Sequence, residues 1–317
     1  MKQIAIVGAG VSGLTTGVLL AERGERVTIF ADETGEQTTS AAAGAIWYPY
    51  DAEPLERAIA WSLATYDALC GLTSDSAAGV TQIELRCFAR AGQIEIPTWA
   101  HELGAQHLDN VPPAFVSGFA ISVPLIDTSI YLPYLAGRFV RARGTIISGV
   151  HLSHLDEVPI EHDVIINCAG IGARELVSDA DLEPHRGQIV LVSKPALDHA
   201  IVCDDPPLMY IFPRANDCVF GGTNSVSDDR APKAAETASI IIECSRVLDA
   251  APSHVIAERV GLRPYRKSGV RLERESLSDG RVAVHNYGHG GSGFTLSWGC
   301  AKEVARLVRS IQSPGTS

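Results

Sequence analysis

Three glycines near the amino terminus have the spacing of a dinucleotide-binding turn. Residues 4–7 form a short apolar segment, and Gly8-Ala9-Gly10-Val11-Ser12-Gly13 follows it directly. Between a strand and a helix, the first glycine allows a tight turn, the second lets a pyrophosphate approach the backbone, and the third lets helix and strand pack closely. Free N–H groups at the helix N-terminus then bind the phosphates. The spacing predicts a nucleotide cofactor contacted by Gly8, Gly10, Val11, Ser12 and Gly13.

An acidic residue after the second strand of such a unit binds a ribose hydroxyl. Here residues 27–30 form the second apolar segment, and Asp32 follows it after one intervening alanine. We therefore predict that Asp32 contacts the ribose. The motif leaves a glycine-rich turn without a nucleotide as an alternative, and it does not separate FAD from NAD.

A second glycine-rich loop lies near the carboxyl end. Tyr287-Gly288-His289-Gly290-Gly291-Ser292-Gly293 stands between an apolar strand and a helix predicted over 294–311. Glycines let backbone lie against a flat ligand with its N–H groups pointing outwards. A helix N-terminus there suits a flavin, whose pyrimidine edge becomes negatively charged on reduction. A surface turn is the alternative, and His289 is not predicted to be a catalytic base.

An arginine and a tyrosine are candidates for binding a substrate. Residues 259–265 alternate in polarity, so a strand would place Gly261 and Arg263 on one face. A guanidinium beside a glycine can bind a carboxylate through two parallel hydrogen bonds, although on the residues alone a solvated arginine is favoured. Tyr210 and Phe212 share one face of a predicted hairpin over 208–222. They are candidates for a pocket wall, with a core position as the alternative.

Composition narrows the class of protein. The chain has 317 residues and a net charge of −11 without a block of Lys or Arg, which argues against nucleic acid or an anionic membrane as partner. Its seven cysteines include no C-x-x-C pair, so we expect neither a disulfide framework nor a metal site, and a reducing cytoplasm fits best. No apolar segment has the length of a signal peptide or a membrane span.

The elements that must position these residues come in an interrupted order. Residues 1–32 are typical of a βαβ unit with parallel strands, and a helix is predicted over 53–70. Apolar strands within 145–155, 163–168 and 282–284 return to the same unit. Antiparallel strands are predicted between these visits, at 81–89, 93–99, 187–193, 208–213, 218–222 and 255–265. An NAD enzyme usually keeps its nucleotide domain contiguous, so this interruption and the second glycine loop favour FAD.

Taken together and in this order, the motifs resemble those of the D-amino acid oxidases and their relatives, the D-aspartate oxidases, along essentially the whole chain. The most specific are Gly261-Leu262-Arg263-Pro264, Arg271-Leu272-Glu273-Arg274-Glu275 and His285-Asn286-Tyr287-Gly288-His289-Gly290-Gly291. The others are at 7–14, 30–32, 38–40, 42–44, 47–50, 167–170 and 186–189.

The resemblance implies an α/β fold with two domains. A discontinuous Rossmann-type domain from 1–52, 140–180 and 270–317 would bind FAD non-covalently, and 53–139 with 181–269 would form a substrate domain around a large antiparallel or mixed sheet. The implied reaction is oxidation of a free neutral or broad-range D-amino acid by O2 to a 2-oxo acid, ammonia and H2O2. A D-aspartate or D-glutamate oxidase and a glycine- or sarcosine-type oxidase are the alternatives.

The resemblance also implies roles for individual residues. Arg263 and Tyr210 would hold the substrate carboxylate, the Gly291 carbonyl would receive the α-amino group, and Tyr48 would line the side-chain pocket. Thr295 would lie near the flavin C2 carbonyl. The remaining cofactor-binding residues implied are Thr38, Thr39, Ser40, Ala43, Gly44, Leu152, Gly288, Gly290, Ser292, Gly293 and Phe294.

This sequence departs from the family pattern in the region of the substrate. Pro206, in a shortened segment, replaces a tyrosine of the active-site lid, so we expect a reduced lid. Asn224 stands where mammalian D-aspartate oxidases carry an arginine for the second carboxylate, which counts against a dicarboxylic substrate. Arg214, on the predicted hairpin turn, is expected to be solvated. A homodimer is left open.

Overall fold

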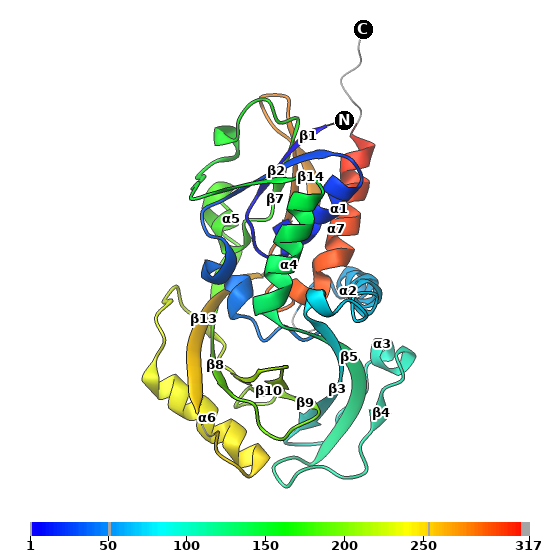
Figure 1. The fold of residues 1–317 in the computed structure, drawn as a ribbon, viewed down its shortest axis with the longest axis vertical. Coiled ribbons are helices and arrows are strands. Elements are labelled where there is room, and N and C mark those ends of the chain that lie inside the picture. Colours follow the sequence, from blue (N-terminus) through cyan, green and yellow to red (C-terminus); the bar gives the residue numbers. More distant parts are fainter. Residues whose placement is uncertain (1, 50–51, 253, 312–317) are drawn as a thin grey trace.

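The computed structural model describes residues 2–49, 52–252 and 254–311, and its elements are arranged around two β-sheets. Figure 1 shows one sheet with its helices in the upper half and the other in the lower half, with the long strands β8 (Leu182–Ser193) and β13 (Val255–Arg266) rising from the lower sheet toward the upper body. Tyr50 of the 47–50 motif lies outside the described residues.

The upper sheet contains the first glycine turn. Its strands run parallel except for the last, β14, which pairs antiparallel with β15. Segments from both ends and the middle of the chain contribute to it, as predicted for a discontinuous Rossmann-type domain. In spatial order the strands are β14 (Arg271–Ser276), β15 (Val282–Tyr287), β7 (Val164–Asn167), β1 (Gln3–Val7), β2 (Arg26–Ala31) and β6 (Thr145–Ser148).

Helices pack closely beside this sheet. α1 (Val11–Glu22) contacts both α7 (Gly293–Ser310) and α4 (Thr128–Arg141), and α2 (Leu55–Cys70) contacts α7. A Cβ atom at Gly299 of α7 would lie 2.2 Å from the Trp61 carbonyl oxygen of α2, so the close crossing of these helices requires glycine. Leu176 of the short helix α5 (Ala173–Leu176) packs in a buried hydrophobic cluster with Val7 and Phe30.

The lower sheet is mixed, as predicted, because β3 and β9 pair in parallel whereas the other neighbours pair antiparallel. β13 also pairs antiparallel with β8, as a branch from the order of the other strands. The other strands in spatial order are β12 (Ser225–Val226), β8, β11 (Asp217–Gly221), β10 (Met209–Pro213), β9 (Ala200–Cys203), β3 (Val80–Ala89), β5 (Ser117–Ile126) and β4 (Gln106–His107).

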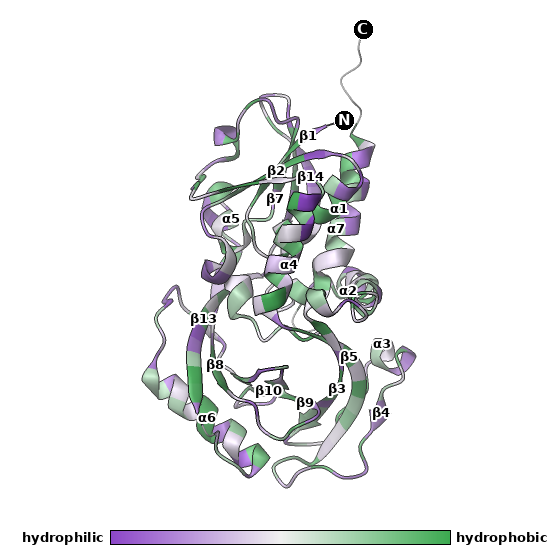
Figure 2. Cartoon of the chain, viewed as in Figure 1, coloured by the Kyte–Doolittle hydropathy of each residue, from purple (hydrophilic) through white to green (hydrophobic). Residues whose placement is uncertain are grey.

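Strand alternation gives this sheet two different faces. Met209 and Ile211 of β10 pack in one cluster with Ile240 of helix α6 (Ala234–Leu248). Because successive side chains of a strand point to opposite faces, Tyr210 and Phe212 face away from α6. Figure 2 shows hydrophobic and hydrophilic residues mixed along α6, as expected of a helix that covers a sheet with one face only.

Two predicted strands differ from the structure. The segment 93–99 forms no strand, because the Ile94 N–H donates to the Ser117 hydroxyl (2.9 Å) and the helix α3 (Thr98–Glu102) follows Pro97. The strand predicted within 145–155 ends at Ser148, where Gly149 takes a positive φ of 71°. The helix of the predicted βαβ unit, α1, begins at Val11, directly after Gly10. β5, α4, α6 and β14 were not predicted.

Short 3-10 helices lie at Gly35–Gln37, Thr39–Ala42, Ser76–Ala78, Leu155–Glu157 and Gly170–Gly172. Within the described residues, none of the helices combines the length and the apolar character needed to cross a membrane.

Candidate active site

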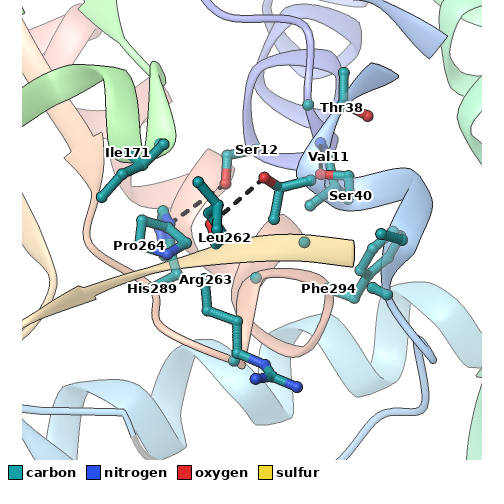
Figure 3. Close-up of a pocket in the computed structure, with 18 of the residues that line it drawn as sticks. Val11, Ser12, Thr38, Ser40, Ile171, Leu262, Arg263, Pro264, His289 and Phe294 are labelled. Carbon is teal, nitrogen blue, oxygen red and sulfur yellow. Dashed lines mark hydrogen bonds between the residues drawn. The ribbon is translucent and has the colours of Figure 1, made fainter. Parts of the chain in front are cut away.

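A cavity of about 460 Å³ extends between the two sheets and is lined by residues from both (Figure 3). This volume is within the range of small-molecule sites. The structure brings nineteen of the predicted site residues to its walls: Gly8, Gly10, Val11, Ser12, Asp32, Thr38, Thr39, Ser40, Ala43, Gly44, Tyr48, Leu152, Tyr210, Arg263, Gly290, Gly291, Gly293, Phe294 and Thr295. The other three predicted residues do not line the cavity, although each is next to a lining residue in the chain: Gly13, Gly288 and Ser292.

The first glycine turn has the geometry that its spacing predicts. Gly8 has a φ of +106°, and a Cβ atom there would lie 2.4 Å from the Cys168 carbonyl oxygen. Gly13 does not line the cavity but packs against the turn that does. A Cβ atom at Gly13 would lie 1.9 Å from the Gly8 carbonyl oxygen, so this contact requires glycine. Gly10 caps α1 without a side chain, and the Ser40 hydroxyl accepts from the Val11 N–H at 3.0 Å. The helix N-terminus therefore opens onto the cavity.

One end of the cavity is lined by residues that follow β2. The Asp32 carboxylate lies 3.1 Å from His151 Nδ1, next to Leu152 in the chain. Arg230, from the segment before α6, forms an ion pair with Glu33, with Nη1 2.5 Å from Oε1. This ion pair links the segment before α6 to the segment that follows β2. The sequence pattern indicated Asp32 but none of His151, Glu33 and Arg230, since a single polar residue in a loop carries no periodic signal.

The second glycine loop brings another helix N-terminus to the same cavity. The Gly290 N–H donates to the Pro264 carbonyl at 2.9 Å, which fixes the loop against β13. Ser292 is the N-cap of α7, and Gly293, Phe294 and Thr295 line the cavity. The Thr295 hydroxyl donates to the Tyr48 carbonyl (3.1 Å) and accepts from the Tyr48 N–H (3.2 Å). These two hydrogen bonds hold the first turn of α7 against the backbone of Tyr48, which lines the cavity.

His289 lies inside this loop and is buried. Its Nε2 is 3.0 Å from the Asn286 side-chain oxygen, and its Nδ1 is 3.5 Å from the Ser12 hydroxyl (Figure 3). This arrangement fits a neutral ring that donates through Nε2 and accepts through Nδ1. Burial lowers the pKa of His289 to about 4, so the ring carries no charge at neutral pH.

The lowered pKa of His289 predicts a loss of stability in mild acid. The unfolded chain binds a proton at the ordinary pKa of about 6.5, whereas the folded chain does so only near 4. Stability from this residue is therefore present above pH 6.5 and is lost as the pH falls toward 4. Between pH 7 and 5 the expected loss is about 2 kcal/mol in the free energy of unfolding.

Urea unfolding of the wild type and of His289→Gln at these two pH values measures this loss. Glutamine keeps a donor and an acceptor but does not titrate in this range, so the variant should lose about 2 kcal/mol less than the wild type between pH 7 and 5. Equal losses in both proteins would contradict the assignment.

Arg263 extends into the opposite end of the cavity. In Figure 3 its side chain points away from Ser12 and Ser40, and its Nη1 donates to the Thr223 carbonyl at 2.9 Å. The guanidinium lies flat on β8, where a Cβ atom at Gly187 would be 2.3 Å from Nη1. One hydrogen bond to the backbone leaves other N–H groups of the guanidinium to bind an anion.

Tyr210 lies beside this guanidinium. Its ring packs over Gly221, where a Cβ atom would be 2.0 Å from Cζ, and stacks on Phe212 with the ring centroids 4.9 Å apart. Burial raises the pKa of Tyr210, and the neighbouring Arg263 opposes that shift. The phenol is therefore protonated at neutral pH and can donate a hydrogen bond to the same anion as Arg263.

A methyl group at Gly187 would displace Arg263. We expect Gly187→Ala to raise KM by about tenfold to a hundredfold, because the guanidinium must leave the surface of β8 and loses its alignment with the substrate. Steady-state kinetics of the FAD-loaded enzyme checks this. Gly172→Ala is the matched control, since Gly172 also lines the cavity but its Cβ atom would meet the nearest atom at an ordinary 3.6 Å. An unchanged KM in Gly187→Ala would contradict the position of Arg263.

The prediction for Arg214 was wrong. Its side chain is buried rather than solvated, with Nε 2.6 Å from Asp217 and Nη1 3.5 Å from Asp127, and it does not line the cavity. Asn224 is exposed and also lies outside the cavity wall. Neither residue therefore supplies a second positive charge or a second donor to the site.

Sequence reasoning missed Asp204 on the cavity wall. It follows β9 in the short connection 204–208 to β10, which also contains Pro206. The Asp204 carboxylate interacts with the Tyr48 hydroxyl; burial and the nearby Asp205 carboxylate raise the pKa of Asp204 to about 6. No motif marks this residue, because its place depends on how three strands pair.

The fold and the site together define a class of protein. Two helix N-termini, two glycine loops and an acidic residue after β2 line a cavity whose wall also carries Arg263 and Tyr210. This arrangement is that of an enzyme with a bound dinucleotide cofactor and a small anionic substrate.

Comparison with known proteins identifies the family. Residues 3–307 match the family described as FAD dependent oxidoreductase, and the chain belongs to that family and uses FAD. A D-amino-acid oxidase of Rubrobacter xylanophilus is 40% identical over 99% of this chain and 98% of its own length. A human D-aspartate oxidase is 33% identical over 96% of this chain and 94% of its own length. Among solved structures, glycine oxidase from Geobacillus kaustophilus superimposes with a TM-score of 0.81 over 99% of this chain and 96% of its own. The two sequences are 19% identical, so the comparison shows a shared fold.

Proposed function

We propose that the protein oxidises free D-amino acids, neutral or of broad range, with O2 as the electron acceptor. The observation that carries this proposal is the Arg263–Tyr210 pair at the end of the cavity opposite Asp32, where an anionic group can be held beside the cofactor. The D configuration is supported by the D-amino-acid oxidases among the relatives, since no motif in the chain distinguishes D from L.

The chain contributes by holding the substrate rather than by acid or base chemistry. Arg263 and Tyr210 bind the α-carboxylate through charge-assisted hydrogen bonds. The Gly291 carbonyl accepts from the α-amino group, and Tyr48 lines the side-chain pocket. When bound, FAD supplies the two-electron oxidant for the substrate Cα–H bond, and O2 is then reduced to H2O2. The imino acid released hydrolyses to a 2-oxo acid and ammonia. Positioning of this kind is a large part of catalysis.

The cofactor residues fit a non-covalently bound FAD. The N-terminus of α1 with Gly10, Val11 and Ser12 would bind the pyrophosphate, and Asp32 the ribose. The second glycine loop with the N-terminus of α7 would lie along the pyrimidine edge of the flavin. In this interpretation segments 1–52, 140–180 and 270–317 form the FAD-binding domain and 53–139 with 181–269 the substrate domain. The acidic net charge supports a small-molecule partner rather than a nucleic acid or an anionic membrane. Seven cysteines without a C-x-x-C pair support a reducing cytoplasm.

A dicarboxylic substrate is the first alternative, because a D-aspartate oxidase is among the relatives. Such a substrate needs a cation or a donor for its second carboxylate. Arg214 is already paired with Asp217 and Asp127, and Asn224 is exposed outside the cavity. The carboxylate of Asp204 on the cavity wall would repel a second carboxylate. These observations favour neutral over acidic side chains.

Peroxide production against a substrate panel tests the proposal. The purified FAD-loaded enzyme would be given D- and L-alanine, D- and L-methionine, D-aspartate, glycine and sarcosine. We expect activity with D-alanine and D-methionine and little with the others. Activity confined to glycine and sarcosine, or to D-aspartate, would replace the proposal by the corresponding alternative.

A further inference from the structure

We propose that the Asp204 carboxylate is a specificity determinant that recognises a cationic side chain, so that D-amino acids with a long basic side chain are preferred over uncharged ones of the same length. This inference rests on the proposed function, because it assigns the substrate class of the same site. It concerns the substrate part of the cavity, whose wall Asp204 and Tyr48 line together with Tyr210 and Arg263.

The strand register places Asp204 on the cavity side of the sheet. Ile201 and Cys203 of β9 pack in the cluster under α6, whereas Val202 belongs to the cluster on the other face and lines the cavity. Val202 is paired directly with Tyr210 of β10, so both side chains point the same way. Asp204 is two residues beyond Val202 and shares its side.

The distance across the sheet suits a long side chain. Tyr210 packs over Gly221 of β11 beside the Arg263 guanidinium, and Asp204 follows β9, two strands away. Two strand spacings correspond to about 10 Å. A substrate whose α-carboxylate is held at Arg263 and Tyr210 reaches this distance with the extended stem of lysine or arginine. Alanine and other short side chains do not.

Asp204 is also available to a ligand. The residue as a whole is accessible to solvent, but it lines the main cavity and a smaller adjoining one, so its carboxylate is accessible from within a concave site that also partly shields it from water. The charged group that acts on it in the described structure is the Asp205 carboxylate, not a cation. The guanidinium of nearby Arg90 is bound to Glu243 at 2.8 Å and to the Pro207 carbonyl at 2.9 Å.

The immediate surroundings hold Asp204 in place and set its charge. The Tyr48 hydroxyl donates to its carboxylate, and this hydrogen bond partly opposes the effect of burial and of Asp205, which raise the pKa of Asp204 to about 6. The titratable groups that face it are Tyr48, Asp205, Cys87 and Cys203, and burial raises the pKa of both thiols. Asp204 is therefore a carboxylate at neutral pH and gains a proton below about pH 6.

Kinetics with D-lysine and D-norleucine isolates this interaction, because the two substrates differ only in the terminal amino group. The FAD-loaded wild type should give a kcat/KM for D-lysine at least about tenfold above that for D-norleucine at pH 7.5. Asp204→Asn should remove the difference while leaving kcat/KM for D-norleucine and D-alanine within about twofold. Asp204→Glu should retain the preference. Asp198→Asn, the same change at an exposed carboxylate outside the cavity, should leave all values unchanged.

The pH dependence gives a second readout. The ratio of the two kcat/KM values should fall as the pH decreases from 7.5 to 5 in the wild type and stay constant in Asp204→Asn, since kcat/KM reports the free enzyme. Equal kcat/KM for the two substrates in the wild type would overturn the proposal, and continued oxidation of D-norleucine would show that the proposed function stands. A similar loss for every substrate in Asp204→Asn would also overturn it, because the carboxylate would then act on the α-amino group.

Discussion

Replacing Arg263 by alanine is expected to lower kcat/KM for D-alanine by roughly 150-fold, mainly through an increase in KM, while FAD stays bound. The guanidinium is the fixed cation at the end of the cavity, so its removal leaves the substrate carboxylate with Tyr210 alone. Loss of one partner of such a pair costs about 3 kcal/mol, and each 1.4 kcal/mol is a factor of ten. Steady-state kinetics with the visible absorption of bound flavin as a control measures both properties.

Tyr210→Phe is the matched comparison for this experiment. It removes one neutral hydroxyl donor and keeps the stacking on Phe212, so we expect a loss of only about tenfold. Arg263→Lys should lie between the two, because lysine keeps the charge but not the paired donors. An unchanged KM in Arg263→Ala would remove this residue from the substrate site.

Gly13→Ala is expected to abolish stable FAD binding. The added methyl group would lie 1.9 Å from the Gly8 carbonyl oxygen, and because the contact is with backbone no side-chain rotation relieves it. Overpacking of this kind costs about 3 kcal/mol or more and moves the turn that receives the pyrophosphate. We expect the dissociation constant for FAD to rise by more than about 100-fold, measured by titrating the apoprotein with FAD.

The stability of the purified protein reports the same defect. Because bound FAD stabilises the folded state, loss of binding should lower the Tm of the variant in the presence of added FAD. Gly172→Ala again serves as the control, since its methyl group would meet Ala169 at 3.6 Å without strain. A Gly13→Ala protein with wild-type flavin content and wild-type Tm would contradict the assigned role of this glycine.

Local patterns predicted the parts of the site that depend on short stretches of chain. The Gly8–Gly13 turn, the 287–293 loop and the strand bearing Arg263 could be identified because glycine spacing and polarity alternation reflect backbone geometry over a few residues. The same reasoning failed at 93–99, where alternating residues resemble a strand but the Ile94 N–H bonds to a side chain. A strand requires a partner, and a partner cannot be inferred from alternation alone.

Residues whose environment is set by distant segments could not be predicted. Arg214 is buried because Asp127, at the start of α4, lies beside it, and nothing near Arg214 in sequence indicates this contact. Asp204 reaches the cavity through the pairing of β9 with β10 and β3. His289 is neutral because it is buried, with its ring nitrogens beside Ser12 of α1 and Asn286 of β15. These features follow from long-range packing, which the sequence encodes only through the whole fold.

Anaerobic mixing of the FAD-loaded enzyme with D- and L-methionine tests the central claim most directly. The proposed function predicts that the D enantiomer bleaches the visible absorption band of the bound flavin, that the L enantiomer does not, and that admitting O2 restores the band with formation of H2O2. Bleaching by neither enantiomer, or by L-methionine alone, would contradict the assignment of this protein as an oxidase of D-amino acids.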